Sequence, residues 1–545
     1  MMQSIIEDQK TAARAYFLCV IGMLVFESLI RLPQYVLILR NRGRPFVNSS
    51  PTHSRVYTYI HKLSTLPSLI PFITNHRLPN LLRLGIFIGL NILWGWNRIK
   101  FTTDYKLYGW LTISNGGLGL LLAARSNLFS HIFRIPSSTL LMYHRWIGRA
   151  TITHATIHFA LNTQHNIETS QLSTVFNNRR IIIGITAWIS LCIIYLTSLS
   201  FIRRRSFEVF YYSHFLFIVF VIGACIHAPE GPQFLLPGLG LWVVDRGIRF
   251  AYNFRPISVK NVTVHDGDLT KFKLGGIRTT QPGQTAWVQI QGVSWLTWHP
   301  FTIASSPGEE DAVIAIRGLG GYTKEVQRLA LNADDSNGDV NREEIAMEGA
   351  KMKIRIDGPY GVGAIRWGMH PVTVLVAGGI GITPGISIAS NILKRASLPA
   401  TNDEDNNGSD RQWHIHMLWI VKSRKHIAWF EEELGGMVEK AKVPGARATF
   451  DITIHVTGSV EGQGSERKVG YEAETPNAYG RPGVMVQGRP DVSAWFSEVK
   501  AKRRGLDTVV SACGPRSLIA AVRKAAAKVS GKDGLFHVEE EVFEL

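Results

Sequence analysis

The sequence predicts a multidomain membrane protein, in which an all-α bundle of seven transmembrane helices precedes an antiparallel β-barrel and an α/β domain with an open parallel sheet. Three observations predict it: long apolar windows fill the first half of the chain, short alternating strands follow, and the last third repeats strand, turn and helix. We expect the boundaries 1–252, 253–368 and 369–545. A chain of 545 residues accommodates three such domains at roughly 150 residues each.

Apolar windows close to the ~20 residues that cross a bilayer occur seven times in the first half. They are residues 15–39, 81–97, 108–124, 138–160, 181–202, 208–228 and 233–251. The first window is too long for a cleavable signal peptide, and Glu27 and Arg31 interrupt it. We therefore expect seven spans that remain in contact with membrane lipid.

The positive charge of the chain is confined to the first half. Residues 1–251 contain 24 Lys and Arg against 8 Asp and Glu, whereas residues 252–545 contain 35 against 34. Because these basic residues separate apolar windows instead of forming one polar stripe, no nucleic-acid partner is expected. Alternate connections carry 11 and 5 basic residues, which predicts that the richer side, and everything after residue 251, is cytosolic.

Histidines concentrate in two of the seven windows, and ionisable residues inside spans indicate function. They are His144, His154 and His158 in the fourth window and His214 and His227 in the sixth. The outermost histidines of each window lie roughly 20 Å apart along helices that run in the same direction. His144 can therefore face His214, and His158 can face His227. Each pair could bind an iron porphyrin from both sides, which predicts two haem b groups.

Two alternatives accompany this metal site. A single buried histidine more often makes an interhelical hydrogen bond, and His154 is assigned that role, with replacement of His158 left open. The 13-residue spacing of His214 and His227 fits one helix face only if the helix bends or is overwound, for which Gly223 is a candidate position.

The second half changes rhythm at residue 371. Before it, strands alternate with Gly and Pro turns, which is typical of a small antiparallel barrel. After it, a buried strand leads into a Gly-rich turn and a helix, where backbone N–H groups can cradle a pyrophosphate. A tight strand-to-helix turn without a ligand is the alternative. The residues of this turn are Gly378, Gly379, Gly381, Thr383 and Pro384.

A basic cluster follows the next predicted strand. Lys422 and Arg424 stand where the ribose of a dinucleotide would lie, and positive charge there suits a 2′-phosphate. The cluster therefore favours NADPH over NADH, although a solvated loop explains the same charges.

Five motifs then give a specific resemblance. They are His299-Pro300-Phe301-Thr302 with the following Ile303–Pro307, Gly358-Pro359-Tyr360-Gly361, the 378–384 turn, Gly488-Arg489-Pro490 and Cys513-Gly514-Pro515. In this order, and with the histidine spacings, the chain from about residue 80 to 545 resembles the ferric reductase and NADPH oxidase superfamily. The motifs and the seven spans are most similar to fungal ferric-chelate reductases.

The resemblance implies a set of site residues. His144, His158, His214 and His227 match the family's haem ligands, and His299, Pro300, Phe301 and Thr302 would line the ring and ribityl chain of FAD. The flavin pyrophosphate would be held by Arg317, Gly320, Gly321, Tyr322 and Thr323. The nicotinamide dinucleotide would be seated by Gly358, Pro359, Tyr360, Gly361 and the 378–384 turn. Cys513 and Gly514 would lie near the nicotinamide as catalytic residues, and Lys422, Arg424 and Arg489 are candidates for the 2′-phosphate.

The resemblance also implies an activity. An enzyme of the plasma membrane would pass electrons from cytosolic NADPH through FAD and two haems to ferric or cupric chelates outside the cell. It would support metal uptake with a ferroxidase and permease system. An NADPH oxidase that makes superoxide is the alternative enzyme, and a transporter or receptor that keeps only the fold is the alternative of another class. The family often ends with an aromatic residue over the flavin ring, whereas this chain ends Phe543-Glu544-Leu545, which leaves the cover of the flavin ring open.

Overall fold

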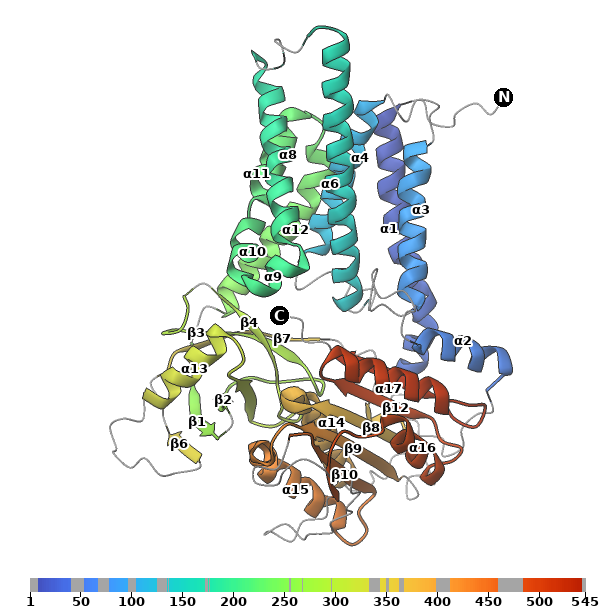
Figure 1. Ribbon diagram of the computed structural model, residues 1–545, viewed down its shortest axis with the longest axis vertical. Helices are drawn as coiled ribbons and strands as arrows, with labels where there is room; N and C mark the ends of the chain where they lie inside the picture. Colours follow the sequence, from blue (N-terminus) through green and yellow to red (C-terminus); the bar gives the residue numbers. More distant parts are fainter. Residues whose placement is uncertain are drawn as a thin grey trace. The chain divides into compact units, whose positions relative to one another are not determined.

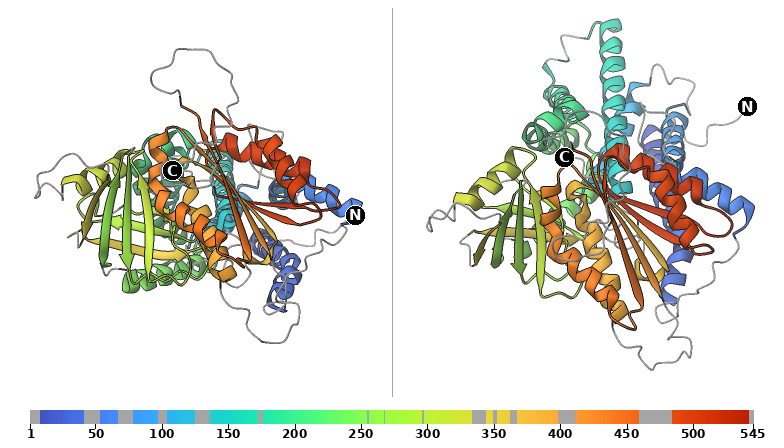
Figure 2. Two further views of the ribbon diagram at one scale, coloured as in Figure 1. Left: turned by 90° about the horizontal axis from the view of Figure 1, so that it is seen from below. Right: turned by 60° about the horizontal axis from the view of Figure 1, so that its bottom comes forward.

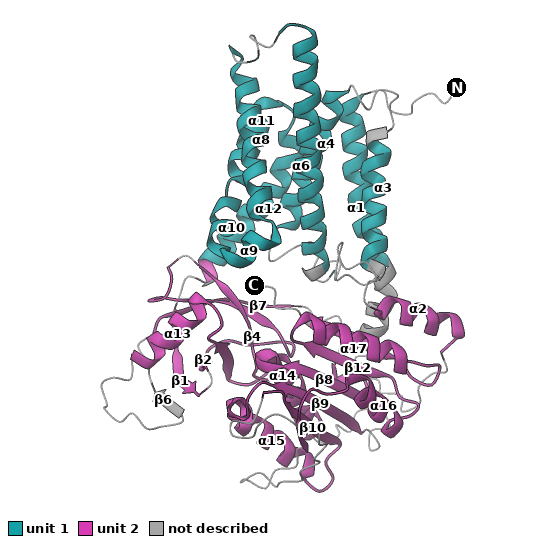
Figure 3. Cartoon of the chain, in the orientation of Figure 1, with its two compact units in different colours: residues 1–39, 79–250, 545 teal, residues 40–78, 251–544 magenta. Residues whose placement is uncertain are grey.

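The computed structural model describes residues 8–541 in two compact units (Figure 3). The first unit contains residues 1–39 and 79–250, and the second contains residues 40–78 and 251–544. Outside the described residues lie 1–7, 41–52, 67–77, 97–103, 125–134, 136, 172–174, 176, 254–255, 267, 296, 333–343, 349–351, 362–366, 398–411, 459–483 and 542–545.

The described residues of the first unit form a helical bundle (Figure 1). Its helices are α1 (Gln9–Arg40), α3 (Leu78–Trp96), α4 (Tyr105–Leu122), α6 (Ser137–Glu168), α8 (Arg179–Thr197), α9 (Ser200–Arg205), α10 (Phe207–His214), α11 (Phe217–His227) and α12 (Pro232–Asn253). A helix is present at each of the seven predicted windows. Among the described residues, three stretches are long and apolar enough to cross a bilayer, namely Gln9–Leu29, Arg179–Thr197 and Phe207–His227. The count of seven spans therefore stays a prediction.

The sixth window is broken into α10 and α11 immediately after His214. Around the break the backbone bonds tighten to the i→i−3 pattern, with Leu216 N–H donating to Ser213 O at 3.0 Å. About five residues at 3.0 per turn and the rest at 3.6 bring His214 and His227 nearly four whole turns apart. The expected overwinding is therefore present, but its expected position at Gly223 was wrong. Gly223 instead lets α11 approach α8, because a Cβ there would stand 3.0 Å from Ala187 Cβ.

Buried polar contacts attach α1 to the rest of the bundle. Tyr16 donates a hydrogen bond to Asn115 on α4 at 2.7 Å. Glu27 pairs with Arg83 on α3 at 2.8 Å, and the hydroxyl of Tyr143 on α6 donates to Glu27 at 3.3 Å. Since a lone charge in an apolar environment is costly, these contacts make α1 part of the bundle.

The larger segment of the second unit, residues 251–544, begins with two antiparallel sheets. The elements are β1 (Val259–His265), β2 (Leu269–Gly275), β3 (Thr285–Ile290), β4 (His299–Thr302), β5 (Asp311–Arg317), α13 (Gly321–Asn332), β6 (Glu344–Glu348) and β7 (Ile354–Tyr360). The sheet orders are β5-β2-β1-β6 and β4-β3-β7, and an isolated bridge between Ile303 and Ile314 joins the two. The alternating inward residues share one core, which includes Phe272 and Val288. Closure into one barrel stays a prediction.

A parallel sheet with helices on both faces follows (Figure 2). The elements are η1 (Trp367–Met369), β8 (Val372–Gly378), η2 (Gly379–Ile382), α14 (Thr383–Ser397), β9 (Trp413–Val421), η4 (Arg424–Phe430), α15 (Glu431–Lys442), β10 (Ala448–Val456), β11 (Val484–Gln487), α16 (Val492–Lys502), β12 (Thr508–Cys513), α17 (Arg516–Val529) and β13 (Phe536–Glu541). Helices α14 and α15 cover one face, and α16 and α17 cover the other.

The strand order of this sheet determines the edge at which a ligand would bind. The order β11-β10-β9-β8-β12-β13 places β8 between β9 and β12, so the connections from β8 and from β12 diverge at one point. In open parallel sheets, ligands bind at the carboxyl ends of the strands at such a switch point. β8 is buried on both faces, which explains its continuous apolar run.

Candidate functional site

The bundle brings the predicted histidines together in two pairs. The ring centres of His144 and His214 lie 6.2 Å apart, and those of His158 and His227 also lie 6.2 Å apart. Two imidazoles that bind one metal from opposite sides at about 2.0 Å would have ring centres about 6 Å apart. Both pairs therefore fit a shared metal ion, and an iron porphyrin would complete the coordination of each ion.

Backbone carbonyls orient three of the four imidazoles. Because a carbonyl can only accept a hydrogen bond, each Nδ1 must carry the proton, which leaves the lone pair of Nε2 for a metal. The acceptors are Gly119 O for His144 (3.0 Å), Tyr105 O for His158 (2.7 Å) and Arg180 O for His227 (2.8 Å). Nδ1 of His214 is buried without a hydrogen-bond partner among the described residues.

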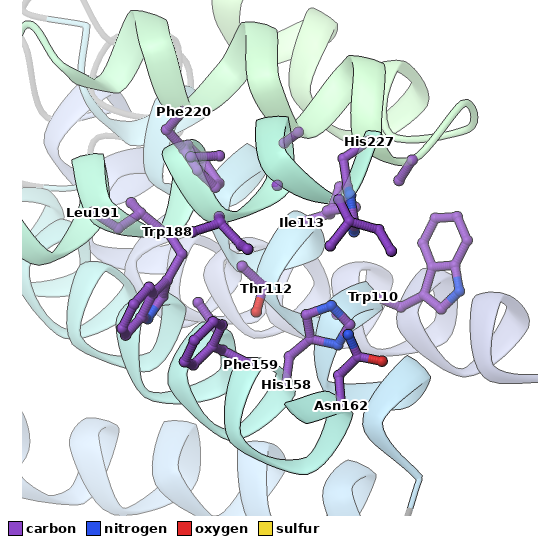
Figure 4. A pocket seen from close by; sticks show the side chains of 18 of the residues that line it. Trp110, Thr112, Ile113, His158, Phe159, Asn162, Trp188, Leu191, Phe220 and His227 are labelled. Carbon is purple, nitrogen blue, oxygen red and sulfur yellow. The ribbon is translucent and has the colours of Figure 1, made fainter. Parts of the chain in front are cut away.

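A cavity of about 210 Å³ lies at the second pair, where one water would need about 10–15 Å³ (Figure 4). His158 and His227 both line it, and Lys106 is the charged side chain among its lining residues. Two glycines make room for the rings. A Cβ at Gly109 would stand 3.1 Å from the His158 ring, and one at Gly184 would stand 2.5 Å from His227 Nδ1.

His154 does not face His227. Its Nδ1 lies 3.3 Å from the side-chain nitrogen of Asn115, and its ring lies 5.9 Å from that of Tyr108. Both neighbours are on α4. The arrangement therefore supports a polar contact between helices for His154 and keeps His158 as the candidate ligand.

The predicted flavin segment contains buried polar atoms that lack partners. Thr302 Oγ1, at the end of β4, and Arg317 Nε, at the end of β5, are buried without a hydrogen-bond partner in the described part of the chain. Burying unsatisfied polar atoms is costly, so their presence at adjoining strand ends fits a ligand that supplies oxygen atoms. The guanidinium of Arg317 lies 5.2 Å over the Trp429 ring, which holds it in place.

Two predicted flavin residues stack on each other. The rings of His299 and Tyr322 have centres 3.8 Å apart at an angle of 28°. Burial lowers the pKa of His299 to about 4, so its imidazole is neutral at physiological pH. Burial likewise raises the pKa of Tyr322 to about 12.

The turn before α13 is stabilised by the side chain of Thr323. Thr323 Oγ1 accepts hydrogen bonds from Leu319 N–H and Gly320 N–H, both at 2.9 Å. No heavy atom lies within 4 Å of a Cβ built at Gly320 or Gly321, so this turn presents an open surface. Thr323 therefore shapes the predicted pyrophosphate segment, and its hydroxyl oxygen is engaged in hydrogen bonds within the turn.

The Gly358–Gly361 motif lies at the end of β7. Gly358 has φ +138°, and a Cβ there would stand 3.2 Å from the backbone of Ala286 on β3. The hydroxyl of Tyr360 donates to the Asp357 carboxylate. Pro359 lies between them in the same strand.

The 378–384 turn and the Cys513-Gly514 turn touch at the switch point. A Cβ at Gly381 would stand 2.6 Å from Cys513 O, and Gly514, at φ +158°, is within 3.2 Å of Gly378 N by the same measure. Only glycine permits this approach. Thr383 and Pro384 begin the buried helix α14. The N-terminus of this helix, which carries the positive end of the helix dipole, therefore lies at the same turn.

The three predicted basic residues lie at the same sheet edge, after two different strands. Lys422 and Arg424 follow β9, Arg489 follows β11, and all three side chains are at least partly exposed. Gly488 N–H donates to Val456 O at the end of β10, at 2.8 Å, which brings the Arg489 segment to this edge. The edge therefore carries positive charge next to the Gly-rich turn.

Several residues of the site were not among the predicted ones. Ser306 Oγ is, like Thr302 Oγ1, a buried oxygen without a partner in the described part, and Ser387 joins the two halves of the second unit by accepting from Gly283 N–H and donating to Ser305 O. Ser306 belongs to the motif beginning at His299, which was a usable signal. Trp429 and Gly184 reach the site through contacts with residues far away in the sequence, so the sequence carried no signal for them. Phe543 lies outside the described residues.

Three family models match successive parts of the chain. The model "Ferric reductase like transmembrane component" matches residues 108–225, "FAD-binding domain" matches 254–364 and "Ferric reductase NAD binding domain" matches 370–527. FAD- and NAD(P)H-binding domains are therefore present behind an integral membrane domain.

Curated relatives of both activities are similar to the chain. It is 26% identical over 65% of its length to a superoxide-generating NADPH oxidase heavy chain of Dictyostelium discoideum, covering 52% of that protein. It is 24% identical over 64% to "NADPH oxidase 1" of Mus musculus, covering 63%. It is 30% identical over 50% to "Ferric reduction oxidase 7, chloroplastic" of Arabidopsis thaliana, covering 38%. The matches thus span less than two thirds of these relatives.

Among solved structures, the flavohem-like FAD/NAD binding domain of nitric oxide dioxygenase from Vibrio cholerae O1 biovar El Tor covers 53% of this chain and 98% of its own, at 15% identity. The TM-score is 0.33, a value at which the likeness adds nothing to the assignment. The assignment rests on the three family models and on relatives that match the chain as ferric reduction oxidases and NADPH oxidases. The chain belongs to the ferric reductase and NADPH oxidase superfamily of transmembrane oxidoreductases.

Proposed function

We propose that the chain is a transmembrane metalloreductase that passes electrons from cytosolic NADPH, through FAD and two b-type haems, to ferric or cupric chelates on the exoplasmic side of the plasma membrane. The observation that carries the proposal is the presence of two histidine pairs, each with ring centres 6.2 Å apart. If each pair held a haem iron through both imidazoles, no coordination position would remain for a substrate, which favours electron transfer to an acceptor that does not bind the iron.

The proposed division of labour follows the boundaries 1–252, 253–368 and 369–545. When bound, the cofactors supply hydride acceptance and one-electron transfer, and the protein supplies orientation. His144, His158, His214 and His227 would hold the haems through Nε2. His299 and Thr302 would contact the ring and ribityl chain of FAD, while Arg317 and Tyr322 would belong to the segment that holds its pyrophosphate.

The switch point would seat the nicotinamide dinucleotide. The glycines of the 378–384 turn and Gly514 allow the backbone to approach the ligand, and Cys513 would border the nicotinamide. Lys422, Arg424 and Arg489 would attract the 2′-phosphate, which is the basis for proposing NADPH instead of NADH.

Haem spectra of two variants test the ligand assignment. In His144→Ala and His227→Ala, we expect each purified protein to lose one of two haems in its reduced-minus-oxidised spectrum. Unchanged haem content in both variants would refute the assignment. A purified wild-type chain without any haem spectrum would instead support a transporter or receptor that keeps only the fold.

A superoxide-producing NADPH oxidase is the second candidate, because two of the relatives described above are named as NADPH oxidases. Membranes supplied with NADPH should be assayed in parallel for Fe(II), by its ferrozine complex, and for superoxide. We expect Fe(II) formation that superoxide dismutase does not suppress. Abundant superoxide without Fe(II) would replace the metalloreductase by the oxidase.

A further inference from the structure

The helix α2 (Arg55–Thr65) has its polar side buried and its apolar side exposed, the reverse of an ordinary surface helix. Thr58, His61 and Thr65 recur at helical spacing on the inner side, and Thr58 and Thr65 are buried. Helix α2 packs against α17 of the nucleotide-binding domain, within the same compact unit.

Polar contacts hold this inner side. The ring of His53, just before α2, bonds to the Asp507 carboxylate at 3.0 Å, and its backbone N–H donates to Lys532 O at 3.1 Å. The ring of His61 meets that of His537 on β13 edge to face, with ring centres 4.8 Å apart. The helix is therefore bound to the domain at both its start and its middle.

The outer side presents large apolar residues to the surroundings. Val56 is 69% exposed, Tyr59 is 64% exposed and Ile60 is 57% exposed, and Tyr57 lies beside them. These residues belong to one helix of 11 residues, so the exposed apolar surface is contiguous and not scattered. A contiguous apolar surface of this kind is unusual on a water-exposed side of a protein and marks a contact with lipid or protein.

Three features of the chain identify lipid as the occupant. Helix α2 lies in the connection between α1 and α3, so both ends of its segment lead into helices of the membrane bundle. The connection, residues 40–80, contains six Lys and Arg and no Asp or Glu, which complements anionic headgroups. Tyrosines beside aliphatic residues are also typical of the headgroup region.

We propose that α2 lies in the membrane interface with Val56, Tyr59 and Ile60 against lipid, while its histidine-bearing side holds the nucleotide-binding domain. The helix would then tether that domain at the membrane surface, in addition to the covalent link at residue 251. This tether is independent of the electron acceptor and of the cofactors.

Lipid photolabelling of the full chain tests the proposal. The protein is placed in nanodiscs of phosphatidylcholine and phosphatidylserine that include a diazirine-bearing phospholipid, irradiated, digested and mapped by mass spectrometry. We expect adducts on Val56, Tyr59 and Ile60, as well as on the exposed side of α11 as the positive control. Adducts on α11 with none on α2 would overturn the proposal.

A matched pair of variants checks that the apolar side is responsible. In Ile60→Asp, we expect loss of the α2 adducts with retention of those on α11. Val443→Asp is the control, because Val443 is 58% exposed at the end of α15 and has no part in α2. It should leave the α2 adducts unchanged. Equal labelling of α2 in the Ile60→Asp variant and the wild type would contradict the proposed contact.

Discussion

Histidines gather in two parts of this molecule and do different things in each. In the bundle, His158 and His227 face each other across a cavity, and each donates its Nδ1 proton to a backbone carbonyl. In the second unit, the ring of His537 lies near those of His61 and His370, with ring centres 4.8 and 5.9 Å away. Ring-centre separation alone does not distinguish the two groups, because 5.9 Å in the second unit is close to 6.2 Å in the bundle. What marks the bundle pair as a candidate ligand pair is the cavity that both rings line and the backbone carbonyls that accept from their Nδ1 atoms.

The largest expected effect breaks the ligand pair through its glycine. Gly184→Ala places a Cβ 2.5 Å from His227 Nδ1, which must displace the ring. We expect the purified variant to contain about half the wild-type haem, as measured by the pyridine haemochrome spectrum. Gly148→Ala is the matched control, because no heavy atom lies within 4 Å of its Cβ. Equal haem in the two variants would mean that His227 holds no haem.

Acid pH should release the docking cluster. Burial lowers the pKa of His537 to about 4 and also lowers the pKa of His370. Asp507 and the ring of His53 face His537 from neighbouring segments. Because released histidines take up protons near their ordinary pKa of about 6.5, docking is complete above that value and weakens as the pH falls towards about 4. Asp507, whose pKa is lowered, stays ionised in this window.

Hydrogen exchange checks this release. After correction for intrinsic rates, residues 53–65 should exchange severalfold faster at about pH 5 than at about pH 7.5. His537→Phe keeps an aromatic ring but cannot titrate, so its pH dependence should be flatter. A wild-type exchange rate that is independent of pH would remove the cluster from any pH response.

A charge in the ligand cavity should tune one haem without removing it. Lys106 lines the cavity with His158 and His227. In Lys106→Gln we expect both haems to remain and the midpoint potential of one to fall by on the order of tens of millivolts, since a nearby positive charge favours the reduced state. Lys106→Arg keeps the charge and should titrate as the wild type does. Parallel shifts of both haems would show that Lys106 acts on neither pair specifically.

The smallest expected effect sharpens the docking side. Asp507→Asn keeps an oxygen that can accept from Leu535 N–H but loses the charge that His53 contacts at 3.0 Å. We expect roughly 1 kcal/mol weaker docking, seen as a modest rise in exchange of residues 53–65 at neutral pH. The haem spectrum should not change. A loss of haem in this variant would show that the two histidine groups are coupled.

The sequence predicted the histidine pairs because helical rise converts spacing into depth. It could not place the pairs around the helix, because the tightened turn after His214 depends on local packing that periodicity does not encode. The glycines of the 378–384 turn were predicted by their spacing after a buried strand. Their contact with Cys513 depends on the order of strands β8 and β12, which only the folded sheet provides.

The docking of α2 was not predicted at all. Its contacts join His53 to Asp507 and His61 to His537, more than four hundred residues apart in the chain. The positive charge of the connection predicts membrane orientation, and that interpretation remains compatible with the helix. The apolar side of α2 was too short a signal for a span, and its polar side resembled an ordinary loop.

The ion pair between Glu27 and Arg83 has a consequence for how the protein is made. When α1 leaves the ribosome, its carboxylate enters the translocon before α3, which carries the partner, has been synthesised. An ionised side chain near mid-helix costs about 2.5–3.5 kcal/mol on insertion. The newly made first segment should therefore wait at the lateral gate until Arg83 arrives, so that the two segments enter the bilayer together.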